Sequence, residues 1–193
     1  MKKKYIFIFL LLFPLINQLS AQDQPQKNYK SNARLNLLSL FVGRFSAQYE
    51  YQFKQNSINL NYNLSFNDNK LGYAAGLSYR YYFSDKRSAF FVGGIANYSD
   101  YSEVVNTKDL LNLYQNFRLR GKCITIAPNA GFRWNILRIF NITGRFGVGV
   151  PFVTDFSWQT PTTLPNEDNQ NNLKTSFKLN AAFDGELSFG IRF

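Results

Sequence analysis

The chain has 193 residues, one cysteine and no histidine, and its 22 basic side chains outnumber its 12 acidic ones. A single cysteine excludes an internal disulfide, and the absence of histidine excludes imidazole bases and imidazole metal ligands, so we expect no cofactor and no metal. The length fits one domain. The basic side chains are scattered along the chain, which favours anionic lipid head groups over nucleic acid as a partner.

The amino terminus has the pattern of a secretory signal peptide. Three lysines, Lys2 to Lys4, precede an apolar run over Tyr5–Ile16, and Ala21 offers a small residue at a cleavage site. We predict a signal peptide over residues 1–21. An uncleaved anchor is the alternative, but the run is shorter than the roughly 20 residues of a membrane helix. Cleavage leaves 19 basic and 12 acidic side chains, a net charge of +7.

The rest of the chain is predicted to form strands. After a polar periplasmic leader over residues 22–32, apolar and polar residues alternate with a period of two, which is typical of a strand with two different faces. We predict one barrel domain over residues 33–193. Its eight strands are expected at residues 33–38, 45–53, 58–66, 71–83, 89–98, 122–134, 139–150 and 177–193.

The carboxyl-terminal segment has the longest alternation. Over the last 18 residues, 176–193, every second position from Phe177 to Phe193 is apolar or glycine, and the positions between them are mostly polar. A period of two puts the two sets on opposite faces of one strand. A strand that ends on a terminal phenylalanine is typical of the closing strand of a membrane barrel.

The connections support the same architecture. Only two are long, Ser99–Gly121 and Pro151–Thr175, and both fall on the external side if the amino terminus is periplasmic. Aromatic residues are expected at both ends of the strands and aliphatic residues between them, as at the two interfaces of a bilayer. The sequence therefore predicts an all-β fold, an eight-stranded antiparallel up-and-down transmembrane β-barrel.

A soluble barrel with a dry ligand cavity is the alternative. The opposite face of the strands argues against it, because that face carries many charges, which would be costly in a dry cavity. In an eight-stranded barrel side chains fill the interior, and we expect arginines and carboxylates to pair there into a plug. This predicted charge network comprises Arg34, Glu50, Arg80, Arg133, Arg145, Asp184, Glu186 and Arg192, with a narrow polar path for solutes as the functional alternative.

Two segments resemble a known group of proteins. The end of the chain, Glu186–Phe193, and the strand pattern over Ile126–Trp134 are similar to the small outer-membrane β-barrels of Gram-negative bacteria, the superfamily of the OmpA transmembrane domain and OmpW. The resemblance implies an outer-membrane location. It also implies that the barrel-insertion machinery reads a terminal assembly signal, here Leu187, Phe189, Ile191 and Phe193. No peptidoglycan-binding domain follows in this sequence, so we do not expect a cell-wall tether of the OmpA kind.

The same resemblance bears on catalysis. Outer-membrane barrel enzymes, such as lipid A deacylases and omptin-type proteases, rely on an active-site histidine, which this chain lacks. Asp184 and Glu186 share one strand face and could in principle act as a carboxylate pair, but the nearby arginines favour ion pairs. We therefore expect no enzymatic activity.

The first long connection carries a second candidate site. Leucines and aromatics recur there at helical spacing, and basic residues follow them. We predict a short helix that packs over the barrel mouth or, as the sharper hypothesis, docks a partner protein or lipopolysaccharide phosphates. The candidate docking residues are Leu110, Leu113, Tyr114 and Phe117.

These patterns predict a non-enzymatic outer-membrane barrel with a structural or protein-interaction role, for example as an accessory subunit of an envelope complex. A narrow channel for small solutes is the alternative. The expected partners are outer-membrane lipid and lipopolysaccharide, the barrel-insertion machinery and other envelope proteins.

Overall fold

The computed structural model describes residues 30–67, 70–84, 88–108, 114–136, 139–159, 165 and 167–193. The predicted signal peptide and most of the polar leader lie outside this part of the chain. The elements are β1 (Ser31–Asn36), α2 (Leu37–Phe41), β2 (Arg44–Phe53), β3 (Asn56–Asn67), β4 (Lys70–Tyr82), β5 (Ser88–Lys108), β6 (Tyr114–Asn135), β7 (Phe140–Val148), β8 (Val150–Gln159), α3 (Glu167–Ala182) and β9 (Phe183–Arg192).

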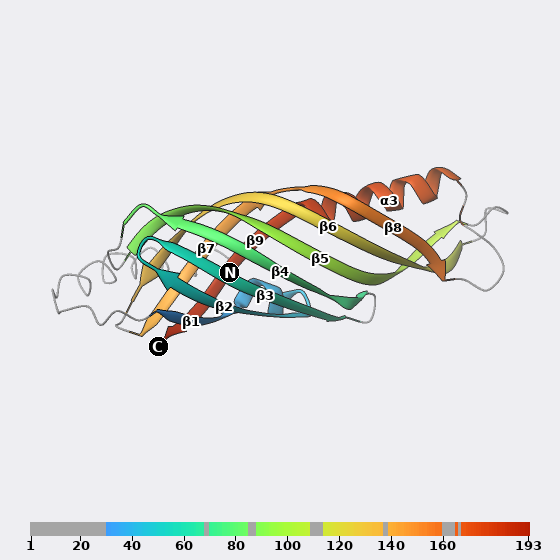
Figure 1. The fold of residues 1–193 in the computed structure, drawn as a ribbon. Coiled ribbons are helices and arrows are strands. Elements are labelled where there is room, and N and C mark those ends of the chain that lie inside the picture. Colours follow the sequence, from blue (N-terminus) through green and yellow to red (C-terminus); the bar gives the residue numbers. More distant parts are fainter. Residues whose placement is uncertain are drawn as a thin grey trace, which may run out of the picture.

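The strands close into an antiparallel barrel (Figure 1). Neighbours along the chain pair from β1 to β6, and β9 closes the ring by pairing with both β7 and β1. β7 and β8 are successive parts of one wall position, because both pair with β6 and only Gly149 separates them. The nine strand segments thus occupy eight positions, which confirms the predicted eight-stranded fold.

The barrel is apolar outside and polar inside. Along β3, Asn59 and Asn61 are buried in the interior, while Ile58 and Leu60 are 49% and 58% exposed. The same alternation runs through the barrel parts of the other strands, with buried asparagine, serine, arginine and glutamate on one face and large exposed apolar side chains on the other. A surface of this kind is stable only where the surrounding solvent is itself apolar, as in a bilayer.

The apolar outer surface has the height of a membrane. Outward-facing residues of β4 are apolar, aromatic or small from Leu71 to Tyr81, a stretch that covers roughly 25 Å along the barrel axis at the ordinary strand rise and tilt. Aromatic rings contact one another at the end where β4 finishes, among them Tyr81 with Phe83 and Phe132 with Trp134. None of the helices in the described ranges is long and apolar enough to cross a bilayer.

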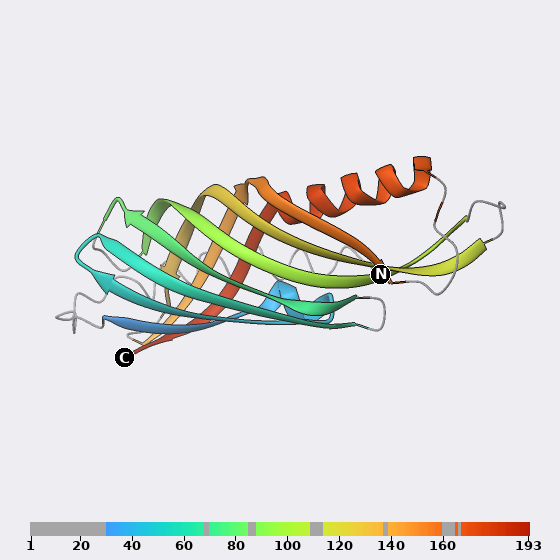
Figure 2. The same cartoon turned by 45° about the vertical axis from the view of Figure 1, so that its right-hand side comes forward.

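The first long connection is mostly strand. The prediction of a loop over Ser99–Gly121 is wrong, because β5 and β6 continue their pairing from Ser88↔Trp134 to Lys108↔Tyr114 and form a hairpin that extends beyond β3 and β4 (Figure 2). Above the apolar belt both faces meet water or other protein groups. Alternation therefore fades there although strand pairing persists.

The second long connection also differs from the prediction. The seventh strand does not stop at Val150, since β8 continues along β6 to Gln159. The closing strand does not begin at Phe177 either, because residues 167–182 form α3 and β9 starts at Phe183. Glu167 and Asp168 in the first turn of α3 complement the positive end of the helix dipole.

The external rim of the barrel is uneven. β1 ends at Asn36 and β9 begins at Phe183, whereas β5, β6 and β8 continue further. Both helices contact β9 on this lower side of the rim; α2 also packs on β2, and α3 also packs on the longer strands β6 and β8. The Asn36 side chain caps α2 by accepting a hydrogen bond from the Leu38 amide at 3.1 Å, and Gly43, with a φ of 69°, turns the chain into β2. The two helices therefore cover the barrel mouth where the wall is lowest.

Candidate functional site

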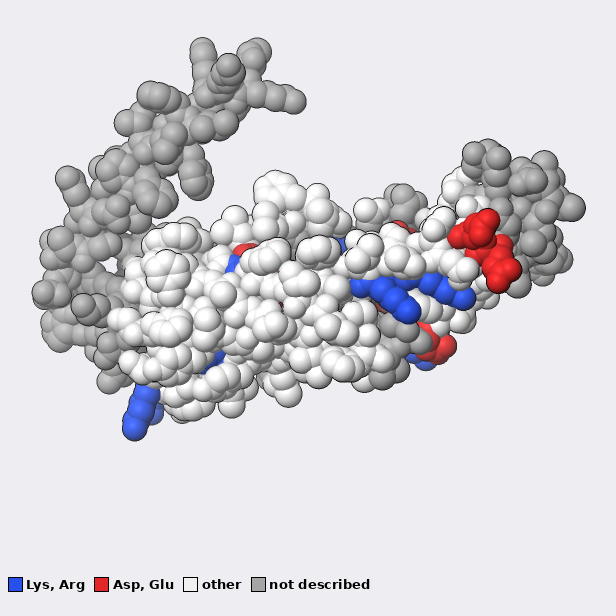
Figure 3. Space-filling view, turned by 90° about the horizontal axis from the view of Figure 1, so that it is seen from above, with Lys and Arg blue, Asp and Glu red and all other residues white. Residues whose placement is uncertain are grey.

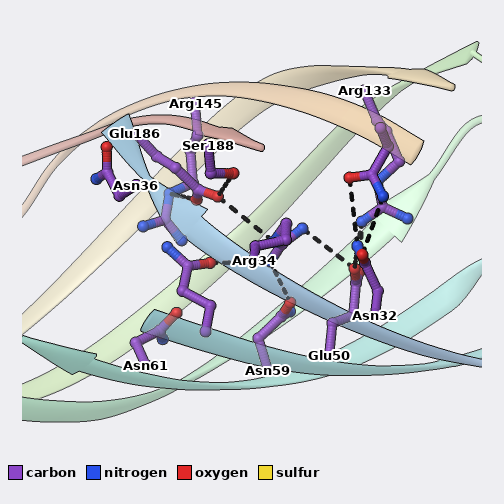
Figure 4. A network of polar contacts seen from close by, with 12 residues as sticks. Asn32, Arg34, Asn36, Glu50, Asn59, Asn61, Arg133, Arg145, Glu186 and Ser188 are labelled. Atoms are coloured by element: carbon purple, nitrogen blue, oxygen red, sulfur yellow. Dashed lines mark hydrogen bonds and ion pairs between the residues drawn. The ribbon is translucent and has the colours of Figure 1, made fainter. Parts of the chain in front are cut away.

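The inner half of the lumen holds a buried charge network (Figure 4), in which Arg34 of β1 is a central member. Its guanidinium lies 3.1 Å from Glu50 and 3.6 Å from Glu186, and its Nη2 donates hydrogen bonds to Gln48 at 2.9 Å and Asn59 at 2.7 Å. Arg34 thereby links acids from the two strands that flank β1, namely β2 and β9, which are far apart in the sequence.

Each glutamate also binds other arginines. Glu186 lies 2.8 Å from Arg80 and 3.2 Å from Arg145, and it accepts a hydrogen bond from Ser188 at 2.5 Å. Glu50 lies 2.5 Å from Arg133. The two glutamates of this network are therefore fully engaged by cations.

The remaining predicted members are placed as follows. Asp184 lies 2.9 Å from Arg145. Arg192 is buried near the opposite end of β9. The ion pairs given above thus join seven of the eight predicted side chains, from six different strands. The sequence analysis missed Tyr82, whose hydroxyl donates a hydrogen bond to Glu50 at 2.8 Å. Its place on the inward face of β4 was the one feature of the sequence that could have identified it.

The network is densely packed and shielded from solvent. Arg34, Glu50 and Arg80 are at most 1% exposed, and aromatic rings lie against the guanidinium groups, with Arg80 over Phe91 at 4.7 Å and Arg133 over Tyr82 at 4.5 Å. Buried charges are tolerated only when they are paired, and removing one partner leaves an uncompensated charge. This arrangement links strands from around the barrel through paired charges.

A chamber of about 330 Å³ lies above the network in the outer half of the lumen. Asn61 and Asn97 line its walls, and residues of α2 and α3, among them Ser39 and Asn180, also line it. Three cationic side chains line the chamber, namely Arg44, Lys70 and Arg145, against one acidic side chain, Asp184. The chamber is therefore polar and carries a surplus of positive charge.

Lys70 sits at the rim of this chamber among several groups. Its ammonium lies 3.7 Å from Glu103 and over the rings of Tyr101 and Phe177, at 5.0 and 5.8 Å from their centroids. Sequence reasoning missed both Lys70 and Arg44, because each lies at a strand end next to a turn. In the alternating pattern both residues fall on the set of positions that faces the lumen, and only this feature could have identified them.

The two predicted docking residues that the structure describes, Tyr114 and Phe117, lie on a strand and not on a helix. Leu110 and Leu113 lie outside the described residues, and Tyr114 begins β6. Phe117 faces inward and is only 1% exposed, because its ring packs edge-on against Trp158 with centroids 6.4 Å apart. The expectation of a helical docking face over residues 114–117 is therefore wrong: period-two spacing from Phe117 onward continues the strand.

Aromatic packing also anchors α3. Phe177 is buried, stacks edge-on against Phe156 at 5.3 Å, and lies where a side chain on Gly121 would otherwise project. The predicted place of Phe177 on the outer face of a strand is thus corrected. Its ring holds α3 against β6 and β8.

The predicted assembly signal lies on the outer face of β9, where Leu187, Phe189, Ile191 and Phe193 are all exposed. The backbone carbonyl of Phe193 accepts a hydrogen bond from the Ser31 amide at 3.1 Å. Within the described ranges, no cluster of three or more histidine, cysteine or acidic side chains is arranged to hold a metal ion.

Comparisons with known proteins give one family. The crystal structure of CarO from Acinetobacter baumannii aligns over 88% of this chain and 99% of its own, with 15% identity and a TM-score of 0.40. Comparison with curated proteins finds no match. The family model described as "Protein of unknown function (DUF3575)" matches residues 6–183. The chain belongs to this family.

Proposed function

We propose that the protein is a non-enzymatic outer-membrane barrel with a sealed lumen, and that its role is structural or in protein interaction. The observation that carries this proposal is the layer of buried, paired charges around Arg34, Glu50 and Glu186, whose members come from strands around the barrel. A barrel closed in this way would act through the surface of the extended β5–β6 hairpin and not through a pore.

The outer-membrane location rests on the surface and on the predicted signal peptide. An apolar belt of bilayer height surrounds the barrel, and the charged side chains seen from above gather toward the extended end (Figure 3). Just beyond the belt, Lys122 lies in register with Asp100 on β5 and with Asp155 on β8. Such a mixed charged zone suits the head groups of lipid and lipopolysaccharide, which we infer to be contacts of the protein.

Other partners belong to the same proposal. We infer that the barrel-insertion machinery reads the terminal residues of β9. We also infer that envelope proteins bind the extended hairpin, since it projects beyond the belt as part of a paired sheet. A stoichiometric partner recovered with the tagged protein from native membranes would support a role as a complex subunit.

A narrow solute channel is the second candidate, and the chamber favours it. The chamber borders the charge network, since Gln48, Arg145 and Asp184 are among its lining residues. Movement of a few arginines would then open a path.

Conductance in planar bilayers tests the two candidates against each other. We expect no steady conductance from the folded wild-type protein and a clear rise in Glu50→Ala, because this change removes the acid that holds Arg34 and Arg133. Folding of each sample is checked by heat-modifiable migration in gels. Steady wild-type conductance would replace the sealed barrel by the channel, and an unchanged Glu50→Ala barrel would contradict the plug.

A further inference from the structure

The chamber above the charge network has the size of a small-molecule site. Its volume of about 330 Å³ is roughly twice that of an engineered cavity that binds benzene, so it would accommodate a solute of about 10–13 non-hydrogen atoms. Residues of the charge network and residues of the two rim helices both line it. An apolar ligand would leave this polar lining unpaired, so the lining chemistry favours a polar ligand.

The charges of the lining favour an anion. Arg44 forms no ion pair with any residue that the structure describes, although it is close enough to Lys70 and Tyr101 to influence both electrostatically. The Lys70 ammonium has one acid, Glu103, at the long distance of 3.7 Å. The outer rim therefore has two neighbouring cations, of which only Lys70 has an acidic partner.

Buried polar atoms of the lining also lack partners among the described residues. The Nη1 of Arg145 and the Oδ1 atoms of Asn61 and Asn97 are buried without a hydrogen bond there. The great majority of buried polar groups in proteins are paired, so such atoms around a cavity point to water or a ligand. The set contains a cationic donor and two neutral acceptors.

From this combination we propose that the chamber binds a small organic anion, a carboxylate that also carries hydroxyl groups. Arg44 and Lys70, which lie close together at the rim, bind the carboxylate. Asn61 and Asn97 accept hydrogen bonds from the hydroxyl groups. The rim is lowest where β1 ends and β9 begins, and α2 and α3 both contact this part of the rim.

The test compares three sugars of nearly equal size and different charge. Glucuronate, glucose and glucosamine are titrated by calorimetry into the full chain, folded in detergent. We expect one glucuronate to bind per barrel and neither neutral glucose nor cationic glucosamine to bind measurably. Failure of glucuronate to bind, or equal binding of all three sugars, would overturn the proposal.

Variants of the rim cations then locate the site. We expect Arg44→Gln and Lys70→Gln each to weaken glucuronate binding about tenfold or more, the size of one charge-assisted hydrogen bond. Arg118→Gln is the matched control, because it removes a charge from the exposed face of β6, and it should bind as the wild type does. Equal weakening in all three variants would mean nonspecific ionic attraction and would contradict a site in the chamber.

Folding defects are separated by the conservative change. Arg44→Lys keeps the charge and should retain most of the affinity for glucuronate. Loss of binding in a folded Arg44→Lys barrel, together with unchanged binding in Arg44→Gln, would contradict the role of charge.

This inference goes beyond the proposed function. A barrel that conducts ions would overturn the plug while glucuronate binding stood, and a sealed barrel without glucuronate binding would overturn only the chamber site.

Discussion

Arg34 and Glu50 join adjacent strands at 3.1 Å, and neither side chain is accessible to solvent. The pair is part of a wider network, since Glu50 also binds Arg133 of β6, across the barrel lumen. One carboxylate therefore holds together strands that are far apart in the sequence.

Glu50→Gln should destabilise the barrel strongly. The change leaves two buried guanidinium groups without a full counter-charge, a loss of about 3–5 kcal/mol. Urea unfolding of the refolded protein in detergent measures the difference. Glu167→Gln, which removes an exposed acid at the start of α3, is the control and should change stability little. Equal stability of the two variants would contradict the structural role of the network.

The contact between Phe177 and Gly121 predicts a non-additive pair of substitutions. Phe177→Ala should cost about 3 kcal/mol and expose α3 to protease, because the ring anchors the helix. Gly121→Ala should cost about 1–3 kcal/mol, since the new methyl group meets the ring.

The double variant should lose less than the sum of the two single losses, because the methyl group added at position 121 no longer meets a ring. Gly144→Ala is the control: a methyl group there meets nothing within 4 Å, and stability should barely change. Additive losses measured by urea unfolding and limited proteolysis would contradict the proposed contact.

The alternation predicted the membrane part of the fold because lipid and lumen make opposite demands on the two faces of a strand. Asn59 and Leu60 are one example, and the pattern located the barrel portions of the strands to within a few residues. The same reasoning placed the arginines and carboxylates inside, where pairing among them follows from the cost of burying charge.

The pattern failed outside the membrane. Asp100 and Arg120 belong to strands although they carry charge outward, since water replaces lipid at that height. Residues 176–182 alternate by coincidence: only Phe177 is buried there, whereas Leu179 is 57% exposed on α3. The chamber could not be predicted from the sequence either, because its rim cations lie at the ends of different strands and come together only in the closed barrel.

The ion pair between Asp100 and Arg120 predicts a pH dependence. Both lie on the outer face of the β5–β6 hairpin beyond the membrane belt, and the Arg120 guanidinium donates two hydrogen bonds to the carboxylate at 2.8 and 2.7 Å. These bonds hold the pKa of Asp100 below its ordinary value of 3.8, against the opposing effect of burial.

A lowered pKa in the folded state means that the pair stabilises the hairpin above about pH 4 and that this contribution is lost as pH falls through the folded-state pKa. Asp100→Asn should therefore reduce stability at about pH 7, and the difference from wild type should narrow below about pH 4. Urea unfolding at several pH values measures it. A difference that does not depend on pH would exclude the carboxylate charge as its cause.

Replacement of the terminal aromatic should impair assembly more than stability. Phe193 is 61% exposed on the outer face, and its contact with Tyr49 is loose, with ring centroids 6.5 Å apart, so Phe193→Ser removes little packing. If the insertion machinery reads this residue, the variant should accumulate in the periplasm and fall in the outer-membrane fraction. Phe53→Ser is the control, because Phe53 is an outward-facing aromatic at the same end of the barrel, on β2. Equal outer-membrane levels of the two variants would mean that the terminal position carries no special signal.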